Sequence, residues 1–341
     1  MTILTSDVLV VAKKKVMAST CSGKLWTTQM IKAVLLDLDG TLIQNDEREF
    51  VSAYLKLATE YFEENIGLSN MGDAILGSIA PMMTAQQHHS TNVEVAIDAI
   101  AKTLGQSAPD LEPLFVDFYA ERFPVLQEYC ASVDSANALI RLLLSMDLEV
   151  VIATNPVYPE TAIFQRMEWA GIPGPEAFAY VTTGDNSHFI KPSPMYYAEI
   201  IARVGVEPEA TLMVGNSLKN DIAPATALGI HTFHLNYAGD EPNIHPDQRG
   251  TLLDLIEHIN TGWLDTLRPN PIHPAMIRAE LQGNLGALYG LLSNVQEHQW
   301  DERPIPNEWT ITEILCHLHN REVNVHRPRL KTILAQNNPF I

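Results

Sequence analysis

The sequence is poor in cysteine and in long apolar runs. Its three cysteines, Cys21, Cys130 and Cys316, lie far apart and form no C-x-x-C motif. This spacing argues against a disulfide framework and favours a reducing cytoplasm. No run of about 18 apolar residues occurs, so no membrane span is expected.

Basic residues are also few. The chain has 22 lysines and arginines against 41 acidic residues, which gives a net charge of −19. This balance argues against a basic face that binds nucleic acid. An anionic substrate would therefore need cations placed locally at its site.

Residues 1–30 are expected to be a disordered N-terminal extension, or to result from the choice of start site. The segment holds a short apolar run that is followed by its lysines, and a signal peptide has the opposite order. Met30 stands directly before the first convincing strand. Secretion is therefore not expected, and the predicted location is cytoplasmic.

From residue 31 to about 260, short β-rich runs alternate with helical patterns, which is typical of a parallel α/β sheet. The strand candidates are nearly continuous in apolar residues, as strands buried on both faces should be. They read "IKAVLLDLD", "LEVVIATN", "AYVTT", "TLMVG" and "IHTFHL". The pattern predicts a core formed by 31–45 and 131–260.

Three segments depart from this alternation. Residues 46–130 contain several helical patterns and no clear strand, which indicates a helical module inserted between the first two core strands. Residues 261–275 include three prolines and read as a linker. Residues 276–341 are again helical in pattern and predict a C-terminal all-α segment.

Two aspartates end the first predicted strand. Asp37 and Asp39 are followed by Gly40 and Thr41, where the chain turns. In an open parallel sheet, ligands bind beyond the carboxyl ends of the strands. Two neighbouring buried carboxylates repel each other unless a cation lies beside them, and Mg²⁺ prefers such oxygen ligands. The alternative is a simple Asp-Gly turn in which Asp39 only caps.

The other predicted strand ends carry matching chemistry. Thr154 and Asn155 supply a hydroxyl and an amide that can bind an oxyanion, and Lys191 supplies an ammonium before a helix. Asn216 and Asp221 follow the next strand and add oxygen ligands. Each alone could be a strand-end hydroxyl, a surface lysine or a helix cap. All four clusters in this order favour one site for a phosphate and a metal.

With these motifs, the sequence resembles the haloacid dehalogenase-like (HAD) hydrolase superfamily over about 31–260. The resemblance implies a Rossmann-like core with a helical cap at 46–130. It implies that Asp37 is the nucleophile and Asp39 the general acid and base. Thr154 would bind the transferring phosphoryl group, which Lys191 would orient and neutralise. Mg²⁺ would be held by Asp37, the backbone carbonyl of Asp39 and the fourth motif.

The fourth motif departs from the family pattern. It usually begins Gly-Asp, and here Gly215 is followed by Asn216, with the acidic residue arriving at Asp221. An asparagine can ligate Mg²⁺ through its carbonyl oxygen but brings no charge. Asp221 is expected to supply that charge, directly or through a water. Weakened metal binding and loss of activity both stay open.

The resemblance favours a Mg²⁺-dependent phosphatase acting on small phosphate monoesters through an aspartyl-phosphate. True dehalogenases generally lack the second aspartate, which is present here as Asp39. A phosphomutase uses the same pair of aspartates and stays an alternative, as does an impaired or non-catalytic binding or scaffold protein. His88 and His89 lie in a polar stretch of the cap and are expected to be solvated.

The C-terminal segment 276–341 is similar to the start of DinB-like helical-bundle domains through "WTITEILCHLHNREVNVH". His317 matches an early metal-ligand position of that family, but the partner histidines are not expected from His319 or His326. Pro328 should kink or end the helix. This incomplete bundle is expected to pack on the core or to form a homo-oligomer through its helices. A metal-dependent transferase activity of this segment is the weakest alternative.

Overall fold

The computed structural model describes residues 30–84, 89–235, 243–270 and 273–335. The predicted extension, except for Met30, and His88 lie outside the described residues. The chain divides into two compact units, Met1–Tyr289 and Gly290–Ile341. The first unit holds the sheet and most of the helices, and each unit is described by itself.

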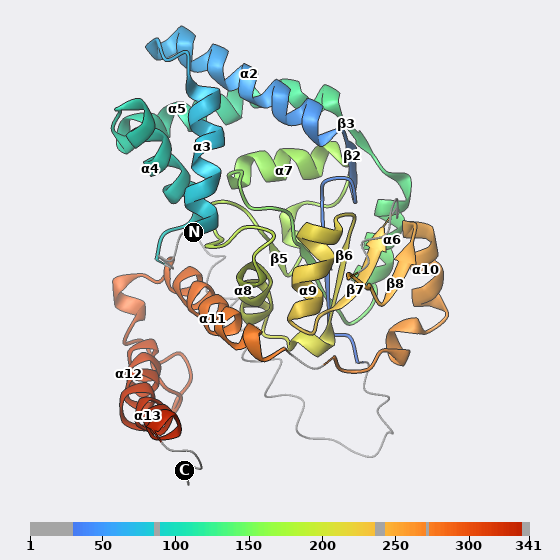
Figure 1. Cartoon of the computed structure of the whole chain (residues 1–341), viewed down its shortest axis with the longest axis vertical. Coiled ribbons are helices and arrows are strands. Elements are labelled where there is room, and N and C mark those ends of the chain that lie inside the picture. The colour runs from blue at the N-terminus through green and yellow to red at the C-terminus, as the bar shows by residue number, and fades with distance from the viewer. Residues whose placement is uncertain (1–29, 85–88, 236–242, 271–272, 336–341) are drawn as a thin grey trace. The chain divides into compact units, whose positions relative to one another are not determined.

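The first unit is built on a six-stranded parallel sheet with the order β5-β4-β1-β6-β7-β8 (Figure 1). The central strand β1 pairs with β4 on one side and with β6 on the other. The sheet and its covering helices confirm the predicted α/β fold class. The strands are β1 (Ala33–Leu36), β4 (Glu149–Ile152), β5 (Tyr180–Val181), β6 (Thr211–Gly215), β7 (His231–Leu235) and β8 (Gln248–Gly250).

The central strands form where the sequence is continuously apolar. Every residue of β1, β6 and β7 is buried, because helices cover both faces of the sheet. The edge strand β8 and a small antiparallel pair were not predicted. That pair joins β2 (Ile43–Asn45) to β3 (Cys130–Ser132), and its three-residue strands are too short and too polar to be visible as a pattern.

Helices cover each face of the sheet with a separate apolar core. One face packs against α6, α7 and α10, and the other packs against α8 and α9. These helices are α6 (Asp134–Leu144), α7 (Glu160–Trp169), α8 (Pro194–Val204), α9 (Ala223–Ala227) and α10 (Leu252–Asn260). Short helical turns complete the unit at η2 (Phe123–Tyr129), η3 (Pro175–Ala177), η4 (Pro208–Ala210), η5 (Leu218–Ile222), η6 (Trp263–Thr266) and η7 (Pro274–Met276).

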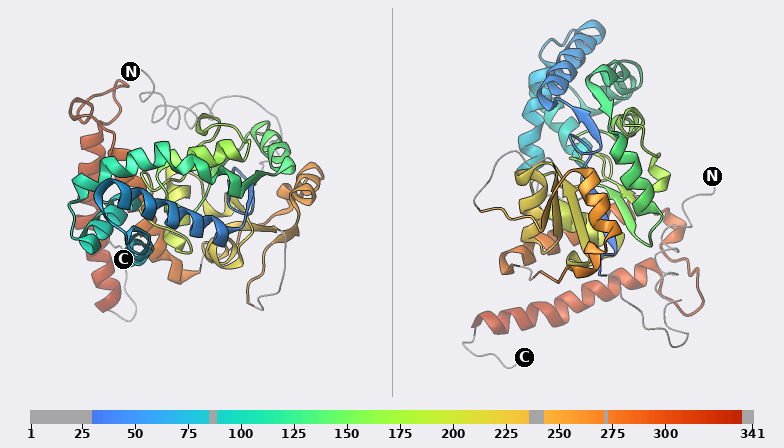
Figure 2. Two further views of the ribbon diagram at one scale, coloured as in Figure 1. Left: turned by 90° about the horizontal axis from the view of Figure 1, so that it is seen from above. Right: turned by 90° about the vertical axis from the view of Figure 1, so that its right-hand side faces the viewer.

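The inserted helices gather at one end of the unit, apart from the sheet (Figure 2). They are α2 (Glu47–Ile66), α3 (Met71–Thr84), α4 (Asn92–Leu104) and α5 (Ala108–Glu121). Asp46 caps the first turn of α2, and Gly67 ends the helix with a φ of 72°, a conformation that glycine adopts without strain. The core of this cap is rich in aromatic rings, among them Phe62 and Phe118.

Helix α11 (Ile277–Leu292) begins beyond the predicted linker, yet its first part packs on α8. The approach is close because two glycines face α8. A Cβ added at Gly283 would lie 2.5 Å from the Cβ of Ala198, and one at Gly286 would lie 3.1 Å from the Cδ of Glu199. The first half of α11 is therefore part of the first unit.

This contact predicts a loss of stability for Gly283→Ala. The added methyl group would also lie 2.6 Å from the backbone of Ala198, which cannot move away as a flexible side chain can. We expect a loss of about 1–3 kcal/mol in the free energy of unfolding, which is typical of overpacking. Urea unfolding followed by circular dichroism measures it.

The matched control is Gly77→Ala, in the interior of α3. Nothing lies within 4 Å of a Cβ added there. This substitution should leave the stability unchanged or raise it by about 0.5–1 kcal/mol, because alanine favours a helix more than glycine does. Equal stability of the two variants would mean that α11 does not pack on α8 in solution.

The second unit contains η8 (Glu297–Gln299), α12 (Ile311–Arg321), η9 (Glu322–His326) and α13 (Arg327–Ala335). His317 lies 4.7 Å from the ring of Trp309, measured between ring centroids, and is exposed. Pro328 was predicted to kink or end the helix. It is the second residue of α13, so the helix does not end there, and the irregular π-helical turn η9 directly precedes α13. None of the described helices combines the length and apolar character that crossing a membrane requires.

Candidate active site

Three of the predicted charged residues meet at the carboxyl ends of the strands. The Lys191 ammonium donates to the Oδ1 atom of Asp37 at 2.7 Å and to the Oδ1 atom of Asp221 at 2.6 Å. The three side chains are each 8% exposed or less. Asp37 follows β1 and Asp221 follows the neighbouring strand β6, whereas Lys191, 154 positions beyond Asp37, reaches both from the segment between β5 and α8.

This buried cluster has two carboxylates for one ammonium. Burial and the charge of Asp221 raise the pKa of Asp37 from 3.8 to about 7, although Lys191 acts against them. Burial alone would lower the pKa of Lys191, but Asp221 and Asp37 outweigh it and raise that pKa well above its ordinary value. The ammonium is thus firmly charged. Because the cluster contains one more carboxylate than ammonium, its charge balance favours the binding of a further cation.

Two threonines and an asparagine complete this side of the site. The hydroxyl of Thr41 donates to the Oδ2 atom of Asp37 at 3.0 Å. The amide oxygen of Asn155 accepts from the backbone N–H of Lys191 at 3.1 Å and so holds that loop. The buried Oγ1 atom of Thr154 has no hydrogen-bond partner among the described residues. Such an atom is costly unless a ligand satisfies it.

The loop after β6 carries the predicted fourth motif. The Oδ2 atom of Asp221 accepts from the backbone N–H of Ser217 at 2.9 Å, so this carboxylate holds both the loop and Lys191. The backbone carbonyl oxygen of Asn216 accepts from the Nε2 atom of His234 at 3.0 Å. A Cβ added at Gly40 would lie 2.1 Å from the Nδ2 atom of Asn216. Glycine at position 40 therefore lets the first and fourth motifs approach.

The structure adds a residue that the sequence did not indicate. Arg166 in α7 is 1% exposed, and its two terminal nitrogens donate to the two carboxylate oxygens of Asp39. The Oδ1 atom of Asp39 also accepts from the Nδ2 atom of Asn45 at 2.9 Å. Burial alone would lower the pKa of Arg166, but Asp39 raises it. Asp39 is thus bound to a different cation from Asp37.

Comparison with known proteins identifies the family. The family model for haloacid dehalogenase-like hydrolases matches residues 31–229, which is more than half of the chain. This chain is a haloacid dehalogenase-like hydrolase. The matched region contains Asp37, Asp39, Thr154, Lys191 and Asp221, which supply the cluster and its neighbours.

Curated relatives of this HAD-like hydrolase are phosphatases. Phosphoglycolate phosphatase of Vibrio cholerae is 26% identical over 245 residues, which cover 66% of this chain and 97% of the Vibrio protein. N-acetylmuramic acid 6-phosphate phosphatase of Pseudomonas aeruginosa is 25% identical over 232 residues, covering 67% and 91%. A solved HAD phosphatase from Thermococcus onnurineus is 22% identical, covers 68% of this chain and 98% of its own, and has a TM-score of 0.45.

The oxygen-rich donor set of this HAD-like hydrolase fits Mg²⁺, the metal that the family resemblance implies. Asp37 and Asp221 bring two carboxylates to one buried place, and the exposed amide side chain of Asn216 lies beside Gly40 of the first motif. Among the residues that the structure describes, no three acidic, histidine or cysteine side chains meet in a metal-binding group. The set is therefore one carboxylate short of a fully acidic site but keeps the hard oxygen chemistry.

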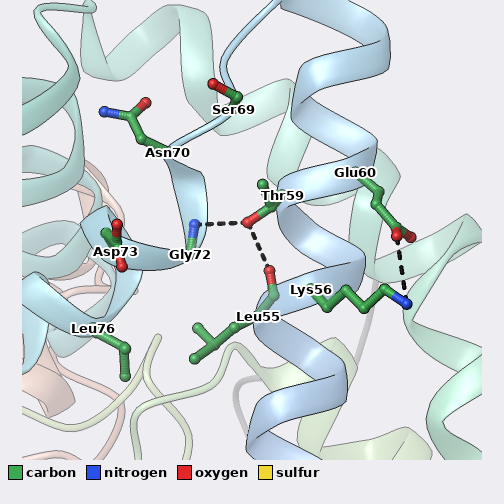
Figure 3. Close-up of a pocket in the computed structure, with 9 residues that line it drawn as sticks. All are labelled: Leu55, Lys56, Thr59, Glu60, Ser69, Asn70, Gly72, Asp73 and Leu76. Carbon is green, nitrogen blue, oxygen red and sulfur yellow. Dashed lines mark hydrogen bonds and ion pairs between the residues drawn. The ribbon is translucent and has the colours of Figure 1, made fainter.

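A hollow of about 410 Å³ lies elsewhere, in the cap of the HAD-like hydrolase between α2 and the start of α3 (Figure 3). Lys56 and Glu60 line it and form an ion pair of 3.8 Å between Nζ and Oε1. Thr59 and Gly72 also line it, and the hydroxyl of Thr59 accepts from the backbone N–H of Gly72 at 3.0 Å. No residue of the strand-end cluster lines this hollow, so the two features are separate.

Proposed function

We propose that this HAD-like hydrolase is a Mg²⁺-dependent phosphatase of small phosphate monoesters. The observation that carries the proposal is the buried pairing of Lys191 with Asp37 after β1, together with the unsatisfied hydroxyl of Thr154 after the neighbouring strand β4. A phosphoryl group placed there would accept from the threonine hydroxyl and lie against the ammonium. The phosphatase names of the curated relatives support the same reaction class.

In the first step, a carboxylate oxygen of Asp37 would form a bond to phosphorus while the bond from phosphorus to the alcohol oxygen breaks. Asp39 would give its proton to the departing oxygen. In the second step, Asp39 would take a proton from water as the water oxygen bonds to phosphorus. The bond between Asp37 and phosphorus then breaks, which releases inorganic phosphate and restores both carboxyl groups.

The residues proposed to hold Mg²⁺ are Asp37, Asp221, Asn216 and the backbone carbonyl of Asp39. When bound, Mg²⁺ would offset the negative charge of the phosphoryl group and of the two carboxylates. Lys191 already supplies one buried positive charge. Thr154 and Asn155 would bind and frame the phosphoryl oxygens, the latter by fixing the backbone at Lys191.

Phosphate release from a substrate panel tests this proposal. The panel contains p-nitrophenyl phosphate, phenyl phosphate, phosphoglycolate and several sugar phosphates, each with millimolar Mg²⁺ and with EDTA. We expect release with Mg²⁺ and loss of nearly all of it with EDTA, restored when Mg²⁺ is added back. Isomerisation of a sugar phosphate without release would instead identify a phosphomutase. Folded protein that releases nothing would point to a non-catalytic role and to the uncharged Asn216.

A further inference from the structure

Arg166 binds the carboxylate of Asp39 in a two-pronged arrangement. Its Nη1 atom donates to Oδ2 at 3.0 Å, and its Nη2 atom donates to Oδ1. A planar guanidinium that binds both oxygens fixes the orientation of a carboxylate, which a single hydrogen bond cannot do. Asn45 adds a third donor to the carboxylate, at its Oδ1 atom. The carboxylate of Asp39 is therefore held against rotation.

Arg166 is itself fixed from several sides. The carbon of its guanidinium lies 4.5 Å from the ring centroid of Phe50 and 5.7 Å from that of Tyr158. Phe50 belongs to the cap helix α2, and Tyr158 follows β4. Such cation–π contacts hold the plane of the guanidinium. The arginine is therefore a rigid donor rather than a flexible surface side chain.

The two partners differ strongly in their exposure. The side chain of Arg166 is 1% exposed, whereas that of Asp39 is 30% exposed. Although both of its oxygens accept from Arg166, the carboxylate of Asp39 is therefore still reached by solvent, whereas the guanidinium is not.

We propose that Arg166 is a positioning residue that aims Asp39 at the oxygen it must protonate and at the attacking water. This inference rests on the proposed phosphatase function, in which Asp39 is the acid and base. A rigid donor pair behind the carboxylate sets its direction before the substrate arrives, and such preorganisation lowers the cost of the proton transfers. Arg166 touches no reacting atom and acts only through Asp39.

The dependence on the leaving group tests the proposal. Phenyl phosphate and p-nitrophenyl phosphate have nearly the same shape, but only the poorer leaving group, phenolate, needs a proton as it departs. For Arg166→Met we expect kcat/KM, which reports the step in which the leaving group departs, to fall about 100-fold with phenyl phosphate, in the usual range for general acid catalysis. With p-nitrophenyl phosphate it should fall less than about 10-fold, because that leaving group departs without needing a proton from Asp39.

Three further variants complete the experiment. Arg166→Lys keeps the charge but loses the two-pronged geometry, so it should show the same preference for p-nitrophenyl phosphate to a smaller degree. In an Asp39→Asn background, Arg166→Met should change neither rate by more than about two-fold, because residues that act as a unit are not additive. Arg203→Met is the matched control, since Arg203 also stacks on a ring, with its guanidinium carbon 4.9 Å from the centroid of Tyr180.

The outcomes separate the inference from the proposed function. Equal losses with both phosphates, or an undiminished loss in the Asp39→Asn background, would overturn the positioning role and leave the phosphatase intact. The same leaving-group effect in Arg203→Met would overturn it too. A wild-type protein that hydrolyses neither phosphate would overturn the proposed function itself. Thermal unfolding of every variant, with Arg166→Lys as the mildest change, excludes a trivial loss of the fold.

Discussion

Asp37→Asn is expected to lower phosphate release by about 1,000-fold or more, the scale on which loss of a nucleophile acts in enzymes with covalent intermediates. An amide nitrogen and a neutral carbonyl oxygen cannot replace a carboxylate in bonding to phosphorus. The loss should appear in kcat for every substrate of the panel, whatever its leaving group. Steady-state rates with p-nitrophenyl phosphate measure it.

The fold of this variant should survive. An amide oxygen can still accept from the hydroxyl of Thr41, and the ammonium of Lys191 keeps Asp221 as its partner at 2.6 Å. Thermal unfolding monitored by circular dichroism should therefore match the wild type closely. A folded Asp37→Asn protein that retained a tenth of the wild-type rate, about 10-fold down, would contradict the assignment of the nucleophile.

Lys191→Met is expected to reduce both activity and stability. The substitution removes the only buried ammonium of the cluster and leaves the carboxylates of Asp37 and Asp221 side by side. Breaking a buried ion pair in this way costs about 3–5 kcal/mol in the free energy of unfolding. The rate should fall by about 100-fold or more, because a charge that stabilises the transferring phosphoryl group is lost.

The stability loss should depend on pH in a fixed direction. The pKa of Asp37 is already raised from 3.8 to about 7 in the folded protein, and Lys191 is a group that lowers it. Without the lysine it rises further, so the unfolded chain ionises at lower pH than the folded one does. Stability of the variant must then fall as pH rises from about 4 through neutrality. Urea unfolding at pH 5 and pH 8 measures this.

The control for that series is Lys56→Met. Lys56 pairs with Glu60 on the surface, and its side chain is 76% exposed. Its removal should change stability by less than about 1 kcal/mol at either pH, as is usual for exposed ion pairs. If Lys191→Met were equally stable at both pH values, the prediction that Asp37 and Asp221 become neighbouring unpaired carboxylates would be wrong.

The sequence located most of the strand-end chemistry because one topological rule was sufficient. Parallel strands present their carboxyl ends at a common edge, so Asp37, Lys191 and Asp221 could be placed together although long stretches of chain separate them. The same rule gave Thr154 and Asn155. The rule could not predict which of these side chains form hydrogen bonds with each other, such as those from Lys191 to the carboxylates of Asp37 and Asp221.

Arg166 could not be predicted because no local pattern distinguishes it. It lies in the helical run "ETAIFQRMEWA", where an arginine would ordinarily face solvent. Its burial depends on Phe50 from the cap and Asp39 from the first strand, which meet it only in the folded chain. A buried charge whose partners come from two distant segments leaves no trace in spacing or composition.

The sequence left the attachment of α11 open, because it allowed the C-terminal helices either to pack on the core or to form a homo-oligomer. The helix was expected to belong to the C-terminal segment because a proline-rich stretch precedes it. Gly283 and Gly286 could have been a signal, since paired small residues permit close helix contacts, but glycines in a helix have several explanations. Only the contact with Ala198 and Glu199 shows which one applies.

That contact bears on how such proteins are cut and recombined. The family match ends at residue 229, and a protein engineer would ordinarily divide the chain soon after the last strand of the sheet. A chain that ended there would lack α11, and the surface of α8 around Ala198 that Gly283 covers would be exposed to water. Helix α8 begins three residues after Lys191. A chimera that omits α11 would therefore remove the packing partner of the helix that follows Lys191, even though every residue of the four motifs was kept.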